Sequence, residues 1–450
     1  MDSERLSAID VAASPGRAIW RVAWPVMLVS LLFTGLHVVD LFWVGRLGKA
    51  AVAGTVLAGS VVGVLFAAGQ MFTVGLMATV ARAAGAGRTE TVAESLWHSL
   101  ALATAFSIPL AVAGALLAPD LVRLFRTAPD VVAEGGPYLR VLLAASPGFF
   151  CGMLLYTMFQ ALGDTRTPMY VIAGANVLNA ALDPLLIFGW LGLPRMGVTG
   201  AATATVVAQL AGLGVMLWLM ARRGLLKAEP LRASVFRTLV GIGAPAGLQG
   251  ITRPLTGMMM FGIVTGFGTA ATAAFGIGMR VLEVMFIYLS GLGTAAEVLT
   301  GQSLGACRPD LARSYGRRIT RVGLGLQLAV LPLVFLFAPW LIAVFNSDPE
   351  VVATGTGYLR VLAPMLVCVG LSVAWAGAQR GAGATAVPMA AALIANWAVK
   401  IPLAIVLARV TGLGLVGVWL GIGLSLVVEA AVLGVGFFRY RWLERKVEWH

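Results

Sequence analysis

Charged residues are scarce in this chain. Only 12% of its 450 residues are Asp, Glu, Lys or Arg, whereas an ordinary soluble protein has about 25%. Hydrophobic residues make up 59% and the mean hydropathy is +0.91. The apolar runs, such as 100–118 and 324–338, are too long for outer-membrane barrel strands, which alternate apolar and polar residues over about ten positions. The composition therefore predicts an all-α membrane protein, with roughly 20 apolar residues in each span.

The residues of common enzyme chemistry are also few. The chain has three histidines, and its sequence contains no Walker loop, nucleophile elbow or HExxH motif. The three cysteines, Cys151, Cys307 and Cys368, lack metal-type spacing and are interpreted as packing residues. We therefore expect no enzyme activity, no cofactor and no ATP-driven step. The net charge of +12 is expected in cytoplasmic loops, so no nucleic-acid partner is predicted.

An internal repeat divides the chain into two halves. At a constant offset of 220 residues, identical residues recur at Pro25/Pro245, Gly48/Gly268, Gly85/Gly305, Arg88/Arg308, Pro129/Pro349, Gly163/Gly383, Pro168/Pro388, Asn176/Asn396 and Gly197/Gly417, and the run 138–142 recurs at 358–362. We expect twelve transmembrane helices, six in each half. Because six is even, the two repeats are parallel and related by a pseudo-two-fold axis along the membrane normal.

The predicted parts of the chain follow from this repeat. They are a cytoplasmic N-terminal tail (1–19), an N-lobe of helices 1–6 (20–221), a basic cytoplasmic linker (222–237), a C-lobe of helices 7–12 (238–438) and a cytoplasmic C-terminal tail (439–450).

Lysine and arginine placement predicts the orientation. With the N-terminus inside, 21 of the 32 basic residues fall in inside segments and six in outside loops. The positive-inside rule then places both termini in the cytoplasm. We therefore expect a multi-pass protein of the inner membrane. The first sixteen residues lack the pattern of a removable signal peptide.

Carboxylates inside the first half are the main candidates for a functional site. Asp40 lies in the first span, and Ser30, Thr34 and His37 give that span a polar face. The fifth span carries Asn176, Asn179 and Asp183 at i, i+3 and i+7, so they share one helix face. Pro184 follows directly and is expected to interrupt the helix. This set predicts a proton or sodium site, although a structural hydrogen bond is the alternative for each carboxylate.

The second half lacks these groups. Asp40, Asn179 and Asp183 correspond to Met260, Val399 and Leu403, and Lys400 appears instead. The weaker candidates for a substrate cleft are His37, Met260, Arg253, Glu283 and Lys400. Four of them have a structural alternative: packing for Met260, a helix kink at Arg253 and Pro254, an ion pair between Arg280 and Glu283, and snorkelling for Lys400. We expect Glu297 and Glu429, near span ends, to reach water.

Four segments resemble the multidrug and toxic compound extrusion (MATE) family. They are residues 39–48 (VDLFWVGRLG), 85–88 (GAGR), 160–168 (QALGDTRTP) and 179–184 (NAALDP), and the resemblance extends over about residues 18–440. It implies a V-shaped pair of six-helix lobes around a central cleft, with antiport against protons or sodium. It also implies a first-lobe cation site, which would hold H⁺ or Na⁺, at Asp40, Asn179 and Asp183, and a bend at Pro25 that accompanies protonation.

The resemblance leaves some points open. Thr203 and Thr205 are both candidates for the sixth-span threonine of the cation site. The NorM-like branch has acidic residues in the seventh and tenth spans, where this chain has Arg253 and no acid, so the DinF-like branch fits better and protons are favoured.

The expected function is export of small organic compounds, cationic or amphipathic, by alternating access in a monomer surrounded by lipid. A flippase for lipids or lipid-linked oligosaccharides is the alternative, and a lipid-modifying membrane enzyme is a third candidate.

Overall fold

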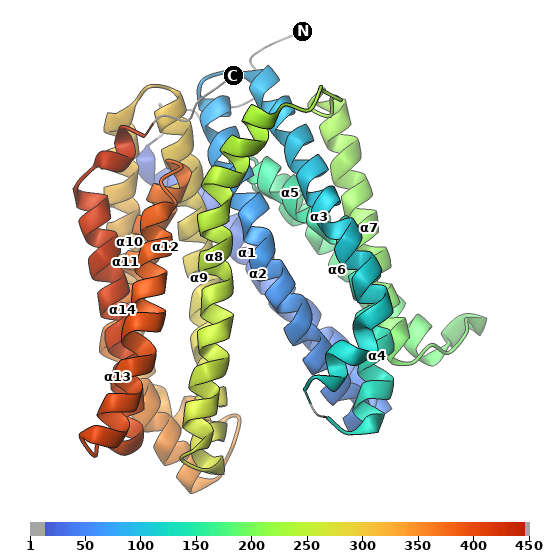
Figure 1. The fold of residues 1–450 in the computed structure, drawn as a ribbon, viewed down its shortest axis with the longest axis vertical. Helices are drawn as coiled ribbons and strands as arrows, with labels where there is room; N and C mark the ends of the chain where they lie inside the picture. The colour runs from blue at the N-terminus through green and yellow to red at the C-terminus, as the bar shows by residue number, and fades with distance from the viewer. Residues whose placement is uncertain (1–13, 126, 446–450) are drawn as a thin grey trace. The chain divides into compact units, whose positions relative to one another are not determined.

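Helices form all the regular structure in the part of the chain that the computed structural model describes, residues 14–125 and 127–445 (Figure 1). The predicted tails lie partly outside the described residues, at 1–13 and 446–450. The first half contains α1 (Pro15–Val44), α2 (Lys49–Gly85), α3 (Thr89–Arg123), α4 (Pro129–Ala144), α5 (Ser146–Ala161), α6 (Arg166–Phe188) and α7 (Val198–Arg222). Short 3₁₀ turns at Gly45–Leu47 and Trp190–Gly192 follow α1 and α6.

The second half repeats this order. It contains α8 (Ala233–Thr265), α9 (Thr269–Gly305), α10 (Pro309–Ala343), α11 (Pro349–Gly381), α12 (Ala386–Leu393), α13 (Ile401–Ile405) and α14 (Gly414–Phe438). Two π-helical segments, η4 (Ile394–Lys400) and η5 (Val406–Val410), join α12 and α13 into one span. A 3₁₀ turn at Arg441–Leu443 follows α14.

The helices account for six spans in each half. Within the described residues, ten helices are long and apolar enough to cross a membrane, and α4 with α5, bent by 54°, forms an eleventh span. Helix α8, 33 residues long, takes the place in the second half that α1 has in the first, which gives twelve. The prediction of an all-α protein with two six-helix lobes is confirmed.

The break between α4 and α5 follows from one proline. Pro147 stands in the first turn of α5, a position that tolerates proline because its missing N–H has no partner in the helix. The equivalent residue of the second half is Val367, and α11 runs through it as one helix.

Contacts between the described residues define two compact units. One contains residues 28–243, and the other contains 14–27 and 244–445. These boundaries differ from the predicted linker at 222–237, because the first turns of α1 pack in the second unit and the first turns of α8 in the first. Glycines allow this approach: a Cβ on Gly291 of α9 would lie 2.5 Å from the carbonyl oxygen of Ala23, and a Cβ on Gly75 of α2 would lie 2.5 Å from that of Leu239.

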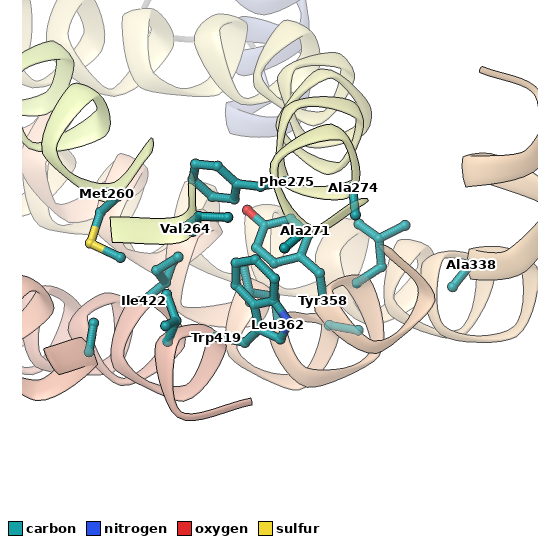
Figure 2. Packing of buried hydrophobic residues seen from close by; sticks show 14 of the residues in the cluster. Met260, Val264, Ala271, Ala274, Phe275, Ala338, Tyr358, Leu362, Trp419 and Ile422 are labelled. Atoms are coloured by element: carbon teal, nitrogen blue, oxygen red, sulfur yellow. The ribbon is translucent and has the colours of Figure 1, made fainter. Parts of the chain in front are cut away.

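Three aromatic side chains pack together within the largely aliphatic core cluster of the second unit (Figure 2). The ring of Tyr358 from α11 lies edge-on to Trp419 of α14 with centroids 4.7 Å apart, and Phe275 of α9 stacks on Trp419 at 5.7 Å. Such pairs contribute about 0.5–1.5 kcal/mol beyond their buried area. They join α9, α11 and α14 into one packed body.

Candidate functional site

The predicted acidic cluster comes together in the first unit. Asp40 of α1 and Asp183 of α6 are close enough for their carboxyl groups to act on each other electrostatically. Asn179 lies one turn before Asp183, and the two side chains are 1% and 0% exposed. Helical spacing on α6 puts both on the face that is buried within the unit.

Two asparagines connect this cluster to neighbouring helices. Asn179 Nδ2 donates to Thr205 Oγ1 of α7 at 3.2 Å, and Asn176 Nδ2 donates to the carbonyl oxygen of Leu32 in α1 at 2.8 Å. Thr203 instead donates to the carbonyl of Thr199 in its own helix at 2.8 Å. Of the two threonines that the sequence left open, Thr205 is therefore the one that contacts the cluster.

The cluster has more acceptors than donors. Five buried oxygens have no hydrogen-bond partner among the described residues: Oδ1 of Asp40, Asn176 and Asn179, and both carboxyl oxygens of Asp183. A buried polar atom without a partner costs about 1–3 kcal/mol, and neighbouring carboxylates repel each other. Protons on the carboxyl groups, or a hard cation that takes oxygen ligands, would relieve both costs. The residues therefore fit a proton or a sodium ion.

Tyr138 is a neighbour of this cluster that the sequence did not single out. The side chain comes from α4, and the charges of both Asp40 and Asp183 act on its hydroxyl. The internal repeat pairs Tyr138 with Tyr358, but the sequence alone did not predict that Tyr138 lies near two carboxylates while Tyr358 packs in an apolar core.

An apolar cluster closes the site one helical turn further along α1 and α6. Val44 and Ile187, each four residues after a carboxylate, pack with Ala51, Val198 and Ala201, and Tyr138 packs against them. This packing makes the surroundings of that end of the acidic cluster apolar.

Hydrophobic core takes the place of the acidic cluster in the second unit. Met260, the counterpart of Asp40, is 1% exposed and packs in the same cluster as Tyr358 (Figure 2). The prediction that Met260 lines a substrate cleft is therefore not supported, because its side chain is enclosed by other apolar groups.

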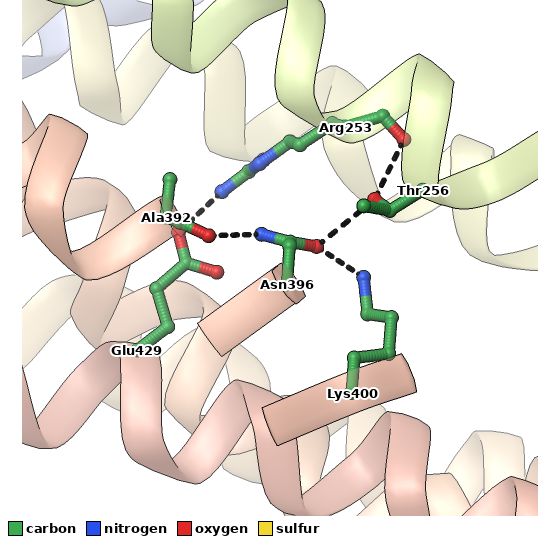
Figure 3. A network of polar contacts seen from close by, with 6 residues as sticks. All are labelled: Arg253, Thr256, Ala392, Asn396, Lys400 and Glu429. Carbon is green, nitrogen blue, oxygen red and sulfur yellow. Dashed lines mark hydrogen bonds and ion pairs between the residues drawn. The ribbon is translucent and has the colours of Figure 1, made fainter. Parts of the chain in front are cut away.

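The second unit also contains a polar cluster, formed by residues of α8, η4 and α14 (Figure 3). Arg253 of α8 donates to Glu429 of α14 at 2.7 Å. Lys400 donates to Asn396 Oδ1, which also accepts from Thr256 Oγ1 at 3.4 Å. The expectation that Glu429 reaches water was wrong: its side chain is 6% exposed and paired, because α14 continues nine residues beyond it.

Four other candidates fall outside both clusters. Glu283 forms the expected ion pair with Arg280 at 3.0 Å, within an open groove of about 890 Å³ lined by α8 and α9. His37 is exposed on α1. Pro25 is buried within α1, which continues through it as one helix. The prediction that Pro184 interrupts the fifth span was wrong. The helix runs on to Phe188, and the proline removes only the hydrogen bond that its N–H would have made.

Comparison with known proteins identifies the family. The MatE family model matches residues 25–185 and 245–406, once in each half. A "Probable multidrug resistance protein NorM" from Deinococcus radiodurans is 33% identical over 94% of this chain and 95% of its own length. One of the same name from Thermotoga maritima is 28% identical, over 95% and 93% of the two chains.

The fold agrees with this result. A crystal structure described as MATE in the bent conformation has a TM-score of 0.89 over 99% of this chain and 98% of its own, at 23% identity. The DinF-like branch stays a prediction. This chain belongs to the MatE family of membrane transporters.

Proposed function

We propose that this protein is a secondary active transporter that exports small amphipathic organic compounds in exchange for protons. The observation that carries the proposal is the set of five buried acceptor oxygens around Asp40 and Asp183, because protons on the carboxyl groups would remove the repulsion between them. The names of the relatives, multidrug resistance proteins, support export of organic compounds. The protein works as a monomer without a cofactor.

The mechanism uses the first lobe as the coupling site. Protons enter from outside and bind at Asp40 and Asp183, which relieves the repulsion between the carboxylates. The neutral cluster favours a different arrangement of α1 against α6, and the bend develops at Pro25. Substrate is released outward, the lobes move as parallel repeats do in other carriers, and the protons leave inward.

The energy available from this exchange is sufficient for export. One charge that crosses 100 mV supplies about 2.3 kcal/mol, and about 1.4 kcal/mol corresponds to a tenfold ratio of concentrations. Each proton that crosses therefore sustains a substrate gradient of roughly 40-fold. We place the protein in the inner membrane with both termini in the cytoplasm, since the basic residues concentrate on that side.

A lipid or lipid-linked oligosaccharide flippase is the second candidate. The observation that favours it is the pair of basic residues Arg253 and Lys400 in the second unit, which suits a phosphate. The acidic cluster in the first unit has no role in such a reaction unless a cation drives it, so we rank the antiporter first.

Efflux from proteoliposomes tests the proposal. A fluorescent dye is loaded, and a pH step and a sodium step of equal size are applied separately. We expect the pH step to drive dye movement. Movement with the sodium step alone would assign the site to sodium. No response to either step would remove the antiport mechanism.

A further inference from the structure

We propose that the polar cluster of the second unit binds a carboxylate of the exported compound, through Arg253 and Lys400. This inference rests on the proposed export function and adds the chemical class of the substrate: amphipathic compounds that carry a carboxylate, including zwitterions.

Arg253 is a cation with donors to spare. A guanidinium has five N–H donors in a planar fork that matches a carboxylate. One of these donors, on Nη2, forms a hydrogen bond to Glu429 Oε1. The Arg253 side chain is 46% exposed while that of Glu429 is 6% exposed, so the arginine, unlike its partner, has side-chain surface that a ligand can reach.

The position of Arg253 shows what kind of space this is. It is the 21st of the 33 residues of α8, well inside the span. A charged group at such a depth is too costly to face lipid hydrocarbon, and it faces a water-filled cavity or protein instead. The exposed side of Arg253 is thus accessible to a polar ligand.

Lys400 lies on the other side of Asn396 (Figure 3). Its ammonium donates to Asn396 Oδ1 and has two further donors. The charges of Arg253 and Glu429 both act on it, so the three groups form one cluster. Asn396 is held in place by its bonds to Ala392, at 2.8 Å, and to Thr256.

The helix geometry at this cluster is unusual. Lys400 ends the π-helical segment η4, and Asn396 lies within it. Wide turns of this kind are frequent at functional sites, and α6, the equivalent span of the first unit, is a regular α-helix.

The charge balance selects an anion. Two cations face one carboxylate, so the cluster has one uncompensated positive charge. Glu429 acts as a positioning residue, because it holds the guanidinium of Arg253 through one nitrogen and leaves the rest of the fork available. A carboxylate of the substrate would neutralise the remaining charge and accept from both basic side chains.

Two dyes that differ only in one group provide the test. Rhodamine 110 has a free carboxylate, and rhodamine 123 is its methyl ester. We would measure Kd for both by fluorescence anisotropy with the purified full-length protein at neutral pH, without an ion gradient. We expect rhodamine 110 to bind at least about tenfold more tightly than the ester.

Two variants assign this preference to the cluster. Lys400→Gln removes one cation and leaves the ion pair intact. Arg253→Gln with Glu429→Gln removes both charges together, since Arg253→Gln alone would leave Glu429 buried without a partner. We expect Lys400→Gln to bind the two dyes about equally, because it removes the uncompensated charge. The double variant keeps Lys400 and the net charge but loses the guanidinium fork, so its preference for rhodamine 110 should fall below that of the wild type. Arg360→Gln is the matched control in the same unit. This exposed arginine of α11 donates to the Phe335 carbonyl, and its loss should preserve the preference.

Several outcomes would overturn the inference. These are equal binding of the two dyes by the wild type, or an unchanged preference in Lys400→Gln. If dihexanoyl phosphatidylglycerol displaces rhodamine 110 while benzoate does not, the cluster binds a lipid phosphate and the carboxylate assignment is wrong. Because no gradient is applied, these binding results do not depend on proton coupling. Export of the ester but not of rhodamine 110 would refute this inference and would still be compatible with antiport.

Discussion

Asn176 and Asn396 lie 220 residues apart, and each forms a hydrogen bond to the first span of its own lobe. Asn176 donates to the carbonyl of Leu32 in α1 at 2.8 Å, and Asn396 accepts from Thr256 in α8 at 3.4 Å. Each asparagine thus joins the fifth span of its lobe to the first span. The two bonds differ in kind, because Asn176 donates to a backbone carbonyl whereas Asn396 accepts from a threonine hydroxyl.

The residues around these asparagines have diverged. In the first lobe, the same helix face continues to Asn179 and Asp183, and the cluster is acidic. In the second lobe, the adjacent polar residue is Lys400, and the place of Asp40 is filled by Met260 within the core. One scaffold therefore presents a cation site in one lobe and a basic cluster in the other.

Asp40→Asn should abolish proton-driven efflux. The substitution keeps the size of the side chain and removes the group that accepts the proton. Asp183→Asn should have the same effect. In proteoliposomes with a pH step, we expect the dye signal of both variants to fall to that of empty liposomes. Their elution volumes in size-exclusion chromatography should equal that of the wild type, which shows that both variants fold.

Asp120→Asn is the matched control for these variants. Asp120 is an exposed carboxylate of α3 paired with Arg123 at 2.7 Å, and exposed pairs contribute about 0–1 kcal/mol. Its efflux should equal that of the wild type. Wild-type efflux in Asp40→Asn would remove Asp40 from the mechanism.

Thr205→Val should weaken both the fold and transport. The substitution preserves shape but takes the acceptor away from Asn179 Nδ2, at a cost of about 1–3 kcal/mol. Thr203→Val is the paired control, because its hydroxyl donates to Thr199 within α7 and the loss of this bond should cost about 1 kcal/mol or less. Thermal unfolding in detergent and efflux rates would compare the two. Equal effects of both substitutions would argue against a specific role for Thr205.

Gly200→Ala should separate α7 from α6. A Cβ at this position would lie 2.6 Å from the carbonyl of Leu186, so the helices must move apart and the contact between Asn179 and Thr205 must lengthen. Overpacking of this kind costs about 1–3 kcal/mol. Gly214→Ala in the same helix has no atom within 4 Å of the new Cβ and should stabilise α7 by up to about 1 kcal/mol. A higher unfolding temperature for Gly200→Ala would contradict this close packing.

The loop before α6 should lose stability at low pH. Partial burial raises the pKa of Asp164. Hydrogen bonds from Arg223 and Thr167 lower it by more, so the pKa in the folded protein lies below the ordinary value. Arg223 donates to Asp164 Oδ2 at 2.6 Å. Because the folded state lowers this pKa, the carboxylate contributes stability above the unfolded pKa of about 3.9, and loses it as pH falls through the folded value.

Asp164→Asn measures this contribution. At pH 7 we expect the variant to be less stable than the wild type by about 1 kcal/mol, given the partial exposure of the pair. The difference should shrink as pH falls below about 4. Thermal unfolding across this range gives the comparison, and a difference independent of pH would show that the charge of Asp164 is not involved.

The fold was predictable because its signals are local or repeated. Apolar runs gave the spans, and the constant offset gave the two lobes. The helix face with Asn176, Asn179 and Asp183 was also readable from spacing, since residues three and four apart share a face.

Contacts between distant spans were not predictable in the same way. The pairing of Arg253 with Glu429 joins residues 176 positions apart, and no periodicity connects α8 to α14. The choice of Thr205 over Thr203 depends on the rotation of α7 against α6. The approach of Tyr138 depends on the angle of α4. These relations are set by packing between helices, which a single sequence does not specify.

The most direct test of the account is proton movement driven by substrate. Proteoliposomes would contain the pH-sensitive dye pyranine in sodium-free buffer, with no initial pH difference, and rhodamine 110 would be added outside. We expect substrate entry to drive protons out and raise the internal pH in the wild type, and no change in Asp40→Asn. Substrate entry without any pH change in the wild type, or an equal pH change in Asp40→Asn, would contradict coupling through the acidic cluster.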